Sequence, residues 1–204
     1  MTTLAMDCST SQGSVALVRD GVVIFDESFD AGRGAGGRIF PILEAARKMV
    51  ERCDRIIVGI GPGSHSGIRI TLAAAEGLRL GMGGDLLGVP SPLGIAEREF
   101  IHVGDARKGS YHFTHVREGK CVDGPRLIVP EDFPGLVGEL SVFCSAPLPL
   151  GGPVLLRVPS AAVLGRIEGL GCSKLPLEPL YLRAPHITVG KPVQGLSSTA
   201  TTVD

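Results

Sequence analysis

Residues 61–70 read Gly-Pro-Gly-Ser-His-Ser-Gly-Ile-Arg-Ile, and this stretch decides how the chain folds. It follows an apolar run from Ile56 to Ile60 and precedes an Ala-rich segment. Glycines permit positive φ and close backbone approach, and proline fixes its own φ. Ser64 or Ser66 can accept hydrogen bonds from the free N–H groups that open a helix. The stretch therefore predicts a tight turn between a buried strand and a helix.

This turn has two interpretations, which the local chemistry leaves open. Backbone N–H groups at a helix start can hold a phosphate or carboxylate, or the turn is purely structural. It lacks the Lys-Ser/Thr ending of a P-loop and the spacing of a dinucleotide fingerprint. Asp7, at the end of the first strand, either holds hydrated magnesium or forms an Asx turn with the hydroxyl residues that follow. The candidate anion or nucleotide loop comprises Asp7, Ser9, Thr10, Gly61, Gly63, Ser64 and Gly67.

The order of strands and helices around this turn predicts a mixed sheet flanked by helices. Alternating apolar residues and turn signals indicate three strands with a hairpin at Asp20-Gly21, followed by alternating helices and strands. The predicted elements are strands 3–8, 14–19, 22–29, 56–60 and 86–89, and helices 38–52, 66–80 and 92–98. An antiparallel start followed by β and α units is typical of an α/β fold.

Near Phe100 the order restarts, which predicts a second, shorter lobe. The predicted elements are strands 100–104, 109–117, 121–129 and 154–158, and a helix at 161–170. We therefore divide the chain into a first lobe at 1–98, a second at 99–188, and a polar tail at 189–204 that we expect to be disordered.

Two neighbouring helices of the first lobe carry surfaces that suit helix packing. The helix after the glycine turn has Ala73, Gly77 and Gly81 at steps of four, and small residues let another helix approach closely. The preceding helix has an apolar stripe, which packs either against the chain's own sheet or against another subunit. The candidate partner interface comprises Ile39, Ile42, Leu43, Ala46, Met49, Arg69, Ala73, Gly77 and Leu80.

Composition limits the classes of function. The net charge of −1 gives no electrostatic reason for the chain to bind nucleic acid or anionic membrane unaided. The five scattered cysteines form no C-x-x-C pair, and no apolar run approaches the roughly 20 residues that span a bilayer. We therefore expect a globular protein of a reducing cytoplasm, without a signal peptide or membrane segment.

No pattern of metal ligands or catalytic groups stands out. His112 and His115 are three residues apart on one predicted strand, which sends them to opposite faces. We therefore expect no metal and no cofactor. His65 lies in the glycine turn, and histidine is a common catalytic acid or base, but neither an acidic partner nor a nucleophile is identifiable beside it. A peptidase that acts through His65 and a nearby serine is thus the weakest of the functions considered.

Four segments of the chain resemble the TsaB (YeaZ) family of tRNA threonylcarbamoyladenosine biosynthesis proteins. The resemblance extends over about residues 4–188, and Gly-Pro-Gly-Ser-x-Ser-Gly-x-Arg-Ile is its most specific part. The matching segments are 4–10 with 14–17, 61–70 with Ala75, Gly77 and Leu78, 88–93, and 105–111. Where the family usually has a Glu-His pair before the first helix, this chain has Gly34 to Gly37, and it has His65-Ser66 where Phe-Thr is usual.

The resemblance implies an actin-like ASKHA (ribonuclease H-like) fold with two lobes and no catalysis by this chain. It implies a scaffold that pairs, through helices 38–52 and 66–80, with a TsaD-like transferase that modifies adenosine 37 of tRNA. A TsaE-like ATPase joins that complex, a homodimer forms without the partner, and tRNA is met only through the complex. The alternative from the residues alone is an ATP-dependent phosphotransferase or ATPase that uses the candidate anion loop.

Overall fold

The structure is a computed structural model that describes residues 1–32, 35–168 and 177–183. The first sheet has the strand order β3-β2-β1-β4-β5. β1 pairs antiparallel with β2 and parallel with β4, and β5 continues the parallel part. The strands are β1 (Thr2–Asp7), β2 (Gln12–Arg19), β3 (Val22–Asp30), β4 (Arg55–Gly59) and β5 (Asp85–Val89). Asp20 and Gly21 both have positive φ, as a two-residue hairpin turn requires.

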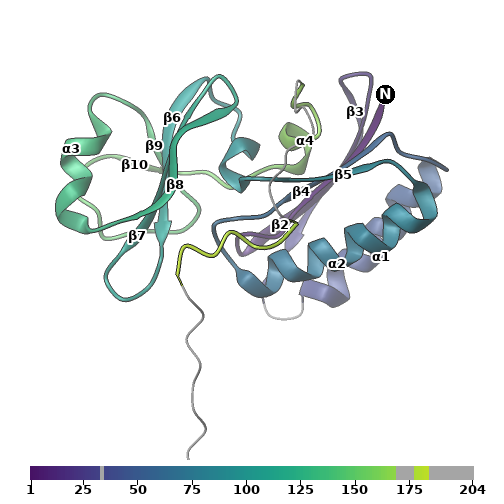
Figure 1. Cartoon of the computed structure of the whole chain (residues 1–204), viewed down its shortest axis with the longest axis horizontal. Helices are drawn as coiled ribbons and strands as arrows, with labels where there is room; N and C mark the ends of the chain where they lie inside the picture. The colour runs from purple at the N-terminus through teal and green to yellow at the C-terminus, as the bar shows by residue number, and fades with distance from the viewer. Residues whose placement is uncertain (33–34, 169–176, 184–204) are drawn as a thin grey trace, which may run out of the picture.

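Helices cover both faces of this sheet (Figure 1). α1 (Ala35–Met49) and α2 (His65–Met82) lie side by side on one face, and α4 (Ala161–Leu164) lies on the other. Pro41 is within α1. Ser64 caps α2, because its side chain accepts a hydrogen bond from the N–H of Gly67. The large core of the first lobe fills the space between the sheet and these two long helices.

The second sheet repeats the topology of the first. Its order is β10-β9-β6-β7-β8, with β6 antiparallel to β7 and parallel to β9. The strands are β6 (Glu99–Asp105), β7 (Tyr111–Arg117), β8 (Lys120–Ile128), β9 (Val142–Cys144) and β10 (Val154–Leu156). β6 thus takes the central place that β1 has in the first sheet, which explains why the sequence pattern restarts near Phe100.

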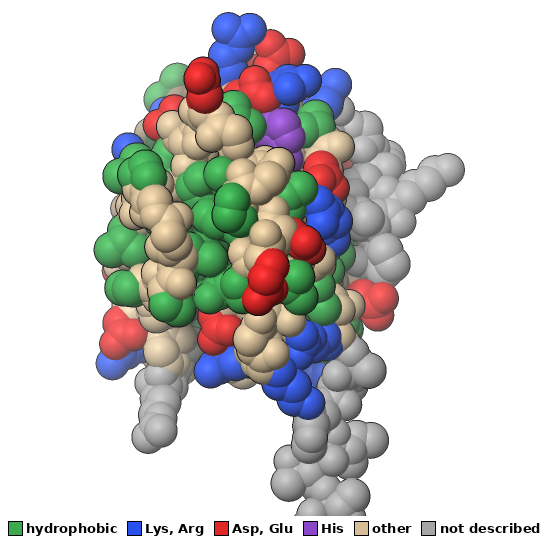
Figure 2. All heavy atoms as spheres, turned by 90° about the vertical axis from the view of Figure 1, so that its left-hand side faces the viewer, with side chains coloured by type: hydrophobic (Ala, Val, Ile, Leu, Met, Phe, Trp, Pro, Cys, Tyr) green, Lys and Arg blue, Asp and Glu red, His purple; other side chains and the backbone are tan. Residues whose placement is uncertain are grey.

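The second lobe has far less helix than the first. Only the single turn η2 (Pro130–Asp132) and α3 (Phe133–Val137) stand in the place of α1, and residues 145–153 form a loop in the place of α2. That loop contains three prolines and two glycines, which do not sustain a helix. Figure 2 shows the outer face of this lobe, which is largely apolar.

The chain returns to the first lobe after the second sheet. α4 contacts β1, β2 and β4, and a buried cluster that contains Ala5, Ile57 and Phe100 joins the two sheets. The segment 177–183, yellow in Figure 1, crosses from the first lobe toward the second. The division at residues 98 and 99 stays a proposal, since later parts of the chain pack on the first sheet. The tail proposed at 189–204 lies outside the described residues.

Most predicted elements are confirmed to within three or four residues, two predictions need correction, and two observed elements were not predicted. The helix predicted at 92–98 is one turn, η1 (Ser91–Gly94), whose four residues are buried and which ends because the backbone is extended at Ile95. α4 ends at Leu164 within the described residues, whereas the prediction extended to residue 170. α3 and β9 were not predicted, since five and three residues are too short to establish a periodicity.

Candidate interaction surface and the closed glycine turn

The glycine turn is pressed against the end of β1. A Cβ on Gly63 would lie 2.1 Å from the carbonyl oxygen of Ser9, and one on Gly67 would lie 2.1 Å from that of Cys8. No side chain fits at either distance, so glycine is required at both positions. The N–H of Ser64 donates to the Ser9 carbonyl at 2.7 Å and locks the two loops together. Close packing of two backbones therefore accounts for these glycines.

Several amides of the turn are already hydrogen-bonded within the chain. Gly61 N–H donates to the Ser91 hydroxyl at 2.9 Å, and Gly67 N–H donates to the Ser64 hydroxyl at 3.3 Å. Thr10 likewise donates its hydroxyl to the carbonyl of Gln12. An anion site at a helix start needs free N–H groups. The turn thus has fewer free donors than its sequence indicates.

Asp7 is enclosed by other residues of the first lobe. Only 1% of its surface is exposed, and its Oδ1 accepts hydrogen bonds from the N–H and hydroxyl of Ser9 at 2.8 and 2.7 Å. Burial raises the pKa of Asp7, although the neighbouring Ser91 and Ser9 act against this. Gly59 leaves the space for the carboxyl, because a Cβ there would lie 1.7 Å from Oδ2. In this conformation the Asp7 carboxyl is therefore not accessible to hydrated magnesium.

The segment 177–183 lies over the glycine turn. Leu180 N–H donates to the carbonyl of Ile60 at 2.9 Å, and the guanidinium of Arg69 donates to the hydroxyl of Tyr181 at 2.7 and 3.0 Å. The ring of His65 meets that of Tyr181 edge-on, with centroids 4.9 Å apart. His65 thus packs against an aromatic ring and has no acidic partner among the described residues. This arrangement gives a His65 peptidase no support.

The predicted interface stripe of α1 is mostly inside the chain. Four of its members are buried in the core between α1 and the first sheet: Ile39, Ile42, Leu43 and Ala46. The expectation that these four face a partner is corrected, since their side chains fill the chain's own core. Met49 is 49% exposed, and Phe40, which the prediction omitted, is 55% exposed. An apolar stripe alone does not distinguish a core face from an interface.

The predicted surface of α2 does face outward. Arg69, Ala73, Gly77 and Leu80 are all exposed, and Leu80 reaches 85%. A Cβ on Gly77 or on Gly81 would meet no atom within 4 Å. The chain itself therefore has no packing need for glycine at these two positions. The result is a flat helix ridge beside an exposed leucine.

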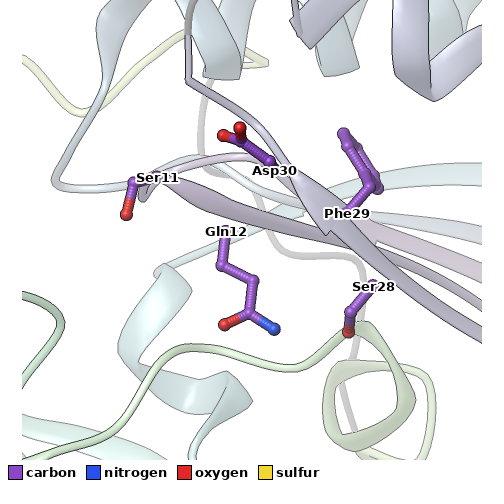
Figure 3. Close-up of a pocket in the computed structure, with 5 residues that line it drawn as sticks. All are labelled: Ser11, Gln12, Ser28, Phe29 and Asp30. Carbon is purple, nitrogen blue, oxygen red and sulfur yellow. The ribbon is translucent and has the colours of Figure 1, made fainter.

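A shallow depression of about 440 Å³ lies at the end of β2 and β3 (Figure 3). Its lining residues are Ser11, Gln12, Ser28, Phe29 and Asp30. The side chains of Gln12 and Ser28 point to one side and those of Phe29 and Asp30 to the other. Asp30 is paired with Arg38 at 2.7 Å. The depression thus brings together no acid, base and nucleophile.

The remaining titratable groups form no metal site. No group of three or more His, Cys, Asp or Glu side chains within the described residues is arranged to hold an ion. His112 and His115 are on opposite faces of β7, as predicted: His112 stacks on His102, and His115 contacts Glu99 at 3.0 Å. The described helices include none with the length and hydropathy to span a membrane.

Comparison with known proteins identifies the family. The profile described as TsaD: tRNA N6-adenosine threonylcarbamoyltransferase matches residues 38–110. The chain is 34% identical over 162 residues to the Escherichia coli tRNA threonylcarbamoyladenosine biosynthesis protein TsaB, covering 68% of this chain and 69% of that protein. The chain belongs to the TsaB family. The chain is also 30% identical over 140 residues to an uncharacterized protein of Mycobacterium leprae. This match covers 65% of the chain and 38% of the M. leprae protein.

The fold of the TsaB family is present as well. YeaZ from Pseudomonas aeruginosa superposes with a TM-score of 0.66 at 21% identity, over 89% of this chain and 99% of that one. A second P. aeruginosa structure, described as similar to peptidase YEAZ, gives a TM-score of 0.68 at 22% identity, over 89% of this chain and 99% of that one. The chain thus has the predicted actin-like ASKHA fold, with two lobes and mixed sheets flanked by helices.

Proposed function

We propose that this chain is a non-catalytic subunit in the biosynthesis of threonylcarbamoyladenosine in tRNA, and that it binds a TsaD-like transferase through α2. The observation that carries the proposal is the exposed ridge of Ala73, Gly77 and Gly81, which no internal contact requires to be small. The family membership and the matching TsaD profile support the choice of pathway and partner.

Glycine inside a helix has a thermodynamic cost. Relative to alanine it destabilises a helix interior by roughly 0.5–1 kcal/mol. At Gly77 an alanine would meet nothing within 4 Å, so the chain alone would be more stable with a methyl group there. A flat ridge is useful where a second helix packs closely against it. Leu80, Met49 and Phe40 then add apolar area at the margin of the contact.

The non-catalytic role is supported by the state of the two candidate sites. Asp7 is enclosed, and amides of the glycine turn are bonded to Ser9, Ser64 and Ser91. We propose further that the chain acts in the cytoplasm, that a TsaE-like ATPase joins the complex, and that two copies pair through the same ridge when the transferase is absent.

The test replaces the ridge glycine with a bulky residue. Gly77→Leu leaves the fold intact, because space around the Cβ is open, but it blocks close helix approach. Overpacking a contact costs about 1–3 kcal/mol, which corresponds to roughly 5- to 150-fold in affinity. Gly135→Leu is the matched control, since Gly135 of α3 is exposed and its Cβ position is also open. The affinity of each variant for the transferase subunit is measured by calorimetry.

We expect Gly77→Leu to weaken binding and Gly135→Leu to leave it unchanged, with the same thermal unfolding for both. Unchanged affinity of a folded Gly77→Leu variant for the transferase would rule out the α2 interface. The alternative, an ATP-dependent phosphotransferase or ATPase, predicts magnesium-dependent binding of ATP by the isolated chain. Calorimetry at millimolar ATP decides this point, and measurable heat of binding would contradict the non-catalytic role.

A further inference from the structure

The hairpin between β6 and β7 carries two cations in a strained conformation. Arg107, Lys108 and Gly109 have φ values of 67°, 53° and 71°, all in the left-handed region. This region costs a residue other than glycine roughly 1–2 kcal/mol, and asparagine or glycine tolerates it better. Both cationic side chains are exposed, that of Arg107 to 88%. The fold alone thus gives no reason for an arginine and a lysine at this tip.

The segment 177–183 places two further cations in line with the hairpin. Arg183 donates from Nη2 to the hydroxyl of Ser110 in the hairpin at 2.6 Å. Arg69 of α2 donates to the hydroxyl of Tyr181, which is two residues before Arg183 in the chain. In Figure 1 the end of this yellow segment lies beside the hairpin at the lower side of the second lobe. We name the set formed by Arg69, Arg183, Arg107 and Lys108 the cationic edge. It therefore extends over both lobes.

Little negative charge opposes the cationic edge. The acidic residues on the same segments are Asp105 and Glu178. Asp105 accepts a hydrogen bond from the backbone N–H of Arg107, and its carboxylate lies 3.9 Å from the guanidinium, at the outer limit of an ion pair. Lys108 has no ion-pair partner within the described residues.

Three arginines in or beside strands of the second sheet pair with carboxylates at shorter distances. The pairs are Arg98 with Glu118 at 2.9 Å, Arg117 with Glu99 at 2.6 Å, and Arg126 with Asp123 at 2.9 Å. Figure 2 shows Lys and Arg side chains at the lower margin of the second lobe, with Asp and Glu side chains nearby. A local positive edge therefore stands out on a chain whose net charge is −1.

We propose that the cationic edge contacts the phosphate backbone of an RNA, which in the complex of the proposed function is the tRNA. An extended line of cations fits a polyanion better than a single small anion, because successive phosphates repeat along a strand. The half-buried hydroxyls of Tyr181 and Ser110, which bind Arg69 and Arg183, hold these two guanidinium groups in place. This inference rests on the proposed function for the identity of the RNA, and the contact is independent of sequence.

The test removes the two hairpin charges without adding strain. Arg107→Asn with Lys108→Asn keeps residues that tolerate positive φ, so the double variant folds at least as stably as the wild type. The matched control, Arg98→Asn with Lys120→Asn, removes two charges from the opposite end of the second sheet, just before β6 and at the start of β8. Each full-length protein is mixed with the transferase subunit, and binding of a labelled tRNA transcript is measured from 50 to 300 mM salt.

Each phosphate contact adds about 0.9 to the slope of log affinity plotted against log salt concentration. At 0.15 M salt, one such contact strengthens binding about fivefold. The hairpin double variant is expected to bind tRNA about 20-fold more weakly and to lose about 2 from the slope. The control variant is expected to keep the wild-type values. Equal tRNA affinity and slope for the hairpin variant and the wild type would overturn the inference.

Binding to the transferase subunit is measured separately for the same proteins. Wild-type protein that fails to bind the transferase would contradict the proposed function, and the tRNA titration is then made on the chain alone. A variant that binds the transferase normally but tRNA weakly supports the cationic edge. A variant that loses both, or a control that loses as much tRNA affinity as the hairpin variant, contradicts a local RNA contact at the hairpin.

Discussion

Lowering the pH should destabilise this protein through two buried histidines. His102 on β6 and His112 on β7 stack with ring centroids 5.4 Å apart, and both are buried. His102 shares its face of β6 with Phe100, which packs between the two sheets. Nδ1 of each ring has no hydrogen-bond partner within the described residues. Protonation would thus place a charge on a buried ring, and the nearby charge of Asp105 compensates this only in part and only at His112.

The size of the effect follows from the pKa values. Burial lowers the pKa of His102 to about 3, with the charge of His112 adding to the effect, and burial lowers that of His112 to about 4. A histidine in the unfolded chain has a pKa near 6.5. Between these values the unfolded state binds protons and the folded state does not, so stability is lost as the pH falls. Between pH 7.5 and pH 5.0 the free energy of unfolding falls by about 2 kcal/mol for each histidine, or by about 4 kcal/mol for the two together.

The assay compares the free energy of unfolding at the two pH values. The chain has no tryptophan, so urea unfolding is followed by far-ultraviolet circular dichroism. The wild type is expected to lose about 4 kcal/mol more than the double variant His102→Gln with His112→Gln, and each single variant should recover about half. His65→Gln removes an exposed ring and serves as the control. An equal loss in the wild type and the double variant would refute the account.

Three further outcomes follow from the site. Gly67→Ala should destabilise the protein by about 1–3 kcal/mol in urea unfolding, because its Cβ would lie 2.1 Å from the carbonyl of Cys8; no loss would contradict the close packing of the turn. Asp7→Asn should be at least as stable as the wild type at pH 7.5, and this advantage should shrink as the pH falls, since burial raises the pKa of the carboxyl. A clearly less stable Asp7→Asn at pH 7.5 would show that the carboxylate is compensated. Tyr181→Phe removes the acceptor of Arg69 and should speed proteolysis at 177–183, with unchanged cleavage as the contrary result.

Much of the fold follows from local signals that the sequence carries. The hairpin at Asp20-Gly21 and the strand before the glycine turn depend on residue types that permit few other conformations. The repeat of the strand pattern after Phe100 likewise predicted a second sheet. α3 and β9 escaped prediction because such short elements are fixed by the contacts of Phe133 and Phe143 with the core rather than by periodicity.

The candidate sites show what local sequence patterns do not predict. The glycine turn has the composition of an anion site, but only the folded chain brings Ser9 and Ser91 to its amides. The stripe of α1 has the pattern of an interface, but only the sheet beneath it shows that Ile39 and Ile42 are core residues.

The sequence by itself thus determined the order of the longer elements, the family and the row of small residues on α2. Only the tertiary structure decided which apolar face is covered, that two buried histidines stack, and that Arg69 and Arg183 align with the hairpin of Lys108. The physical reason is that backbone preference and hydrophobic periodicity act over a few neighbouring residues. Burial, desolvation and charge proximity depend instead on residues far apart in the chain.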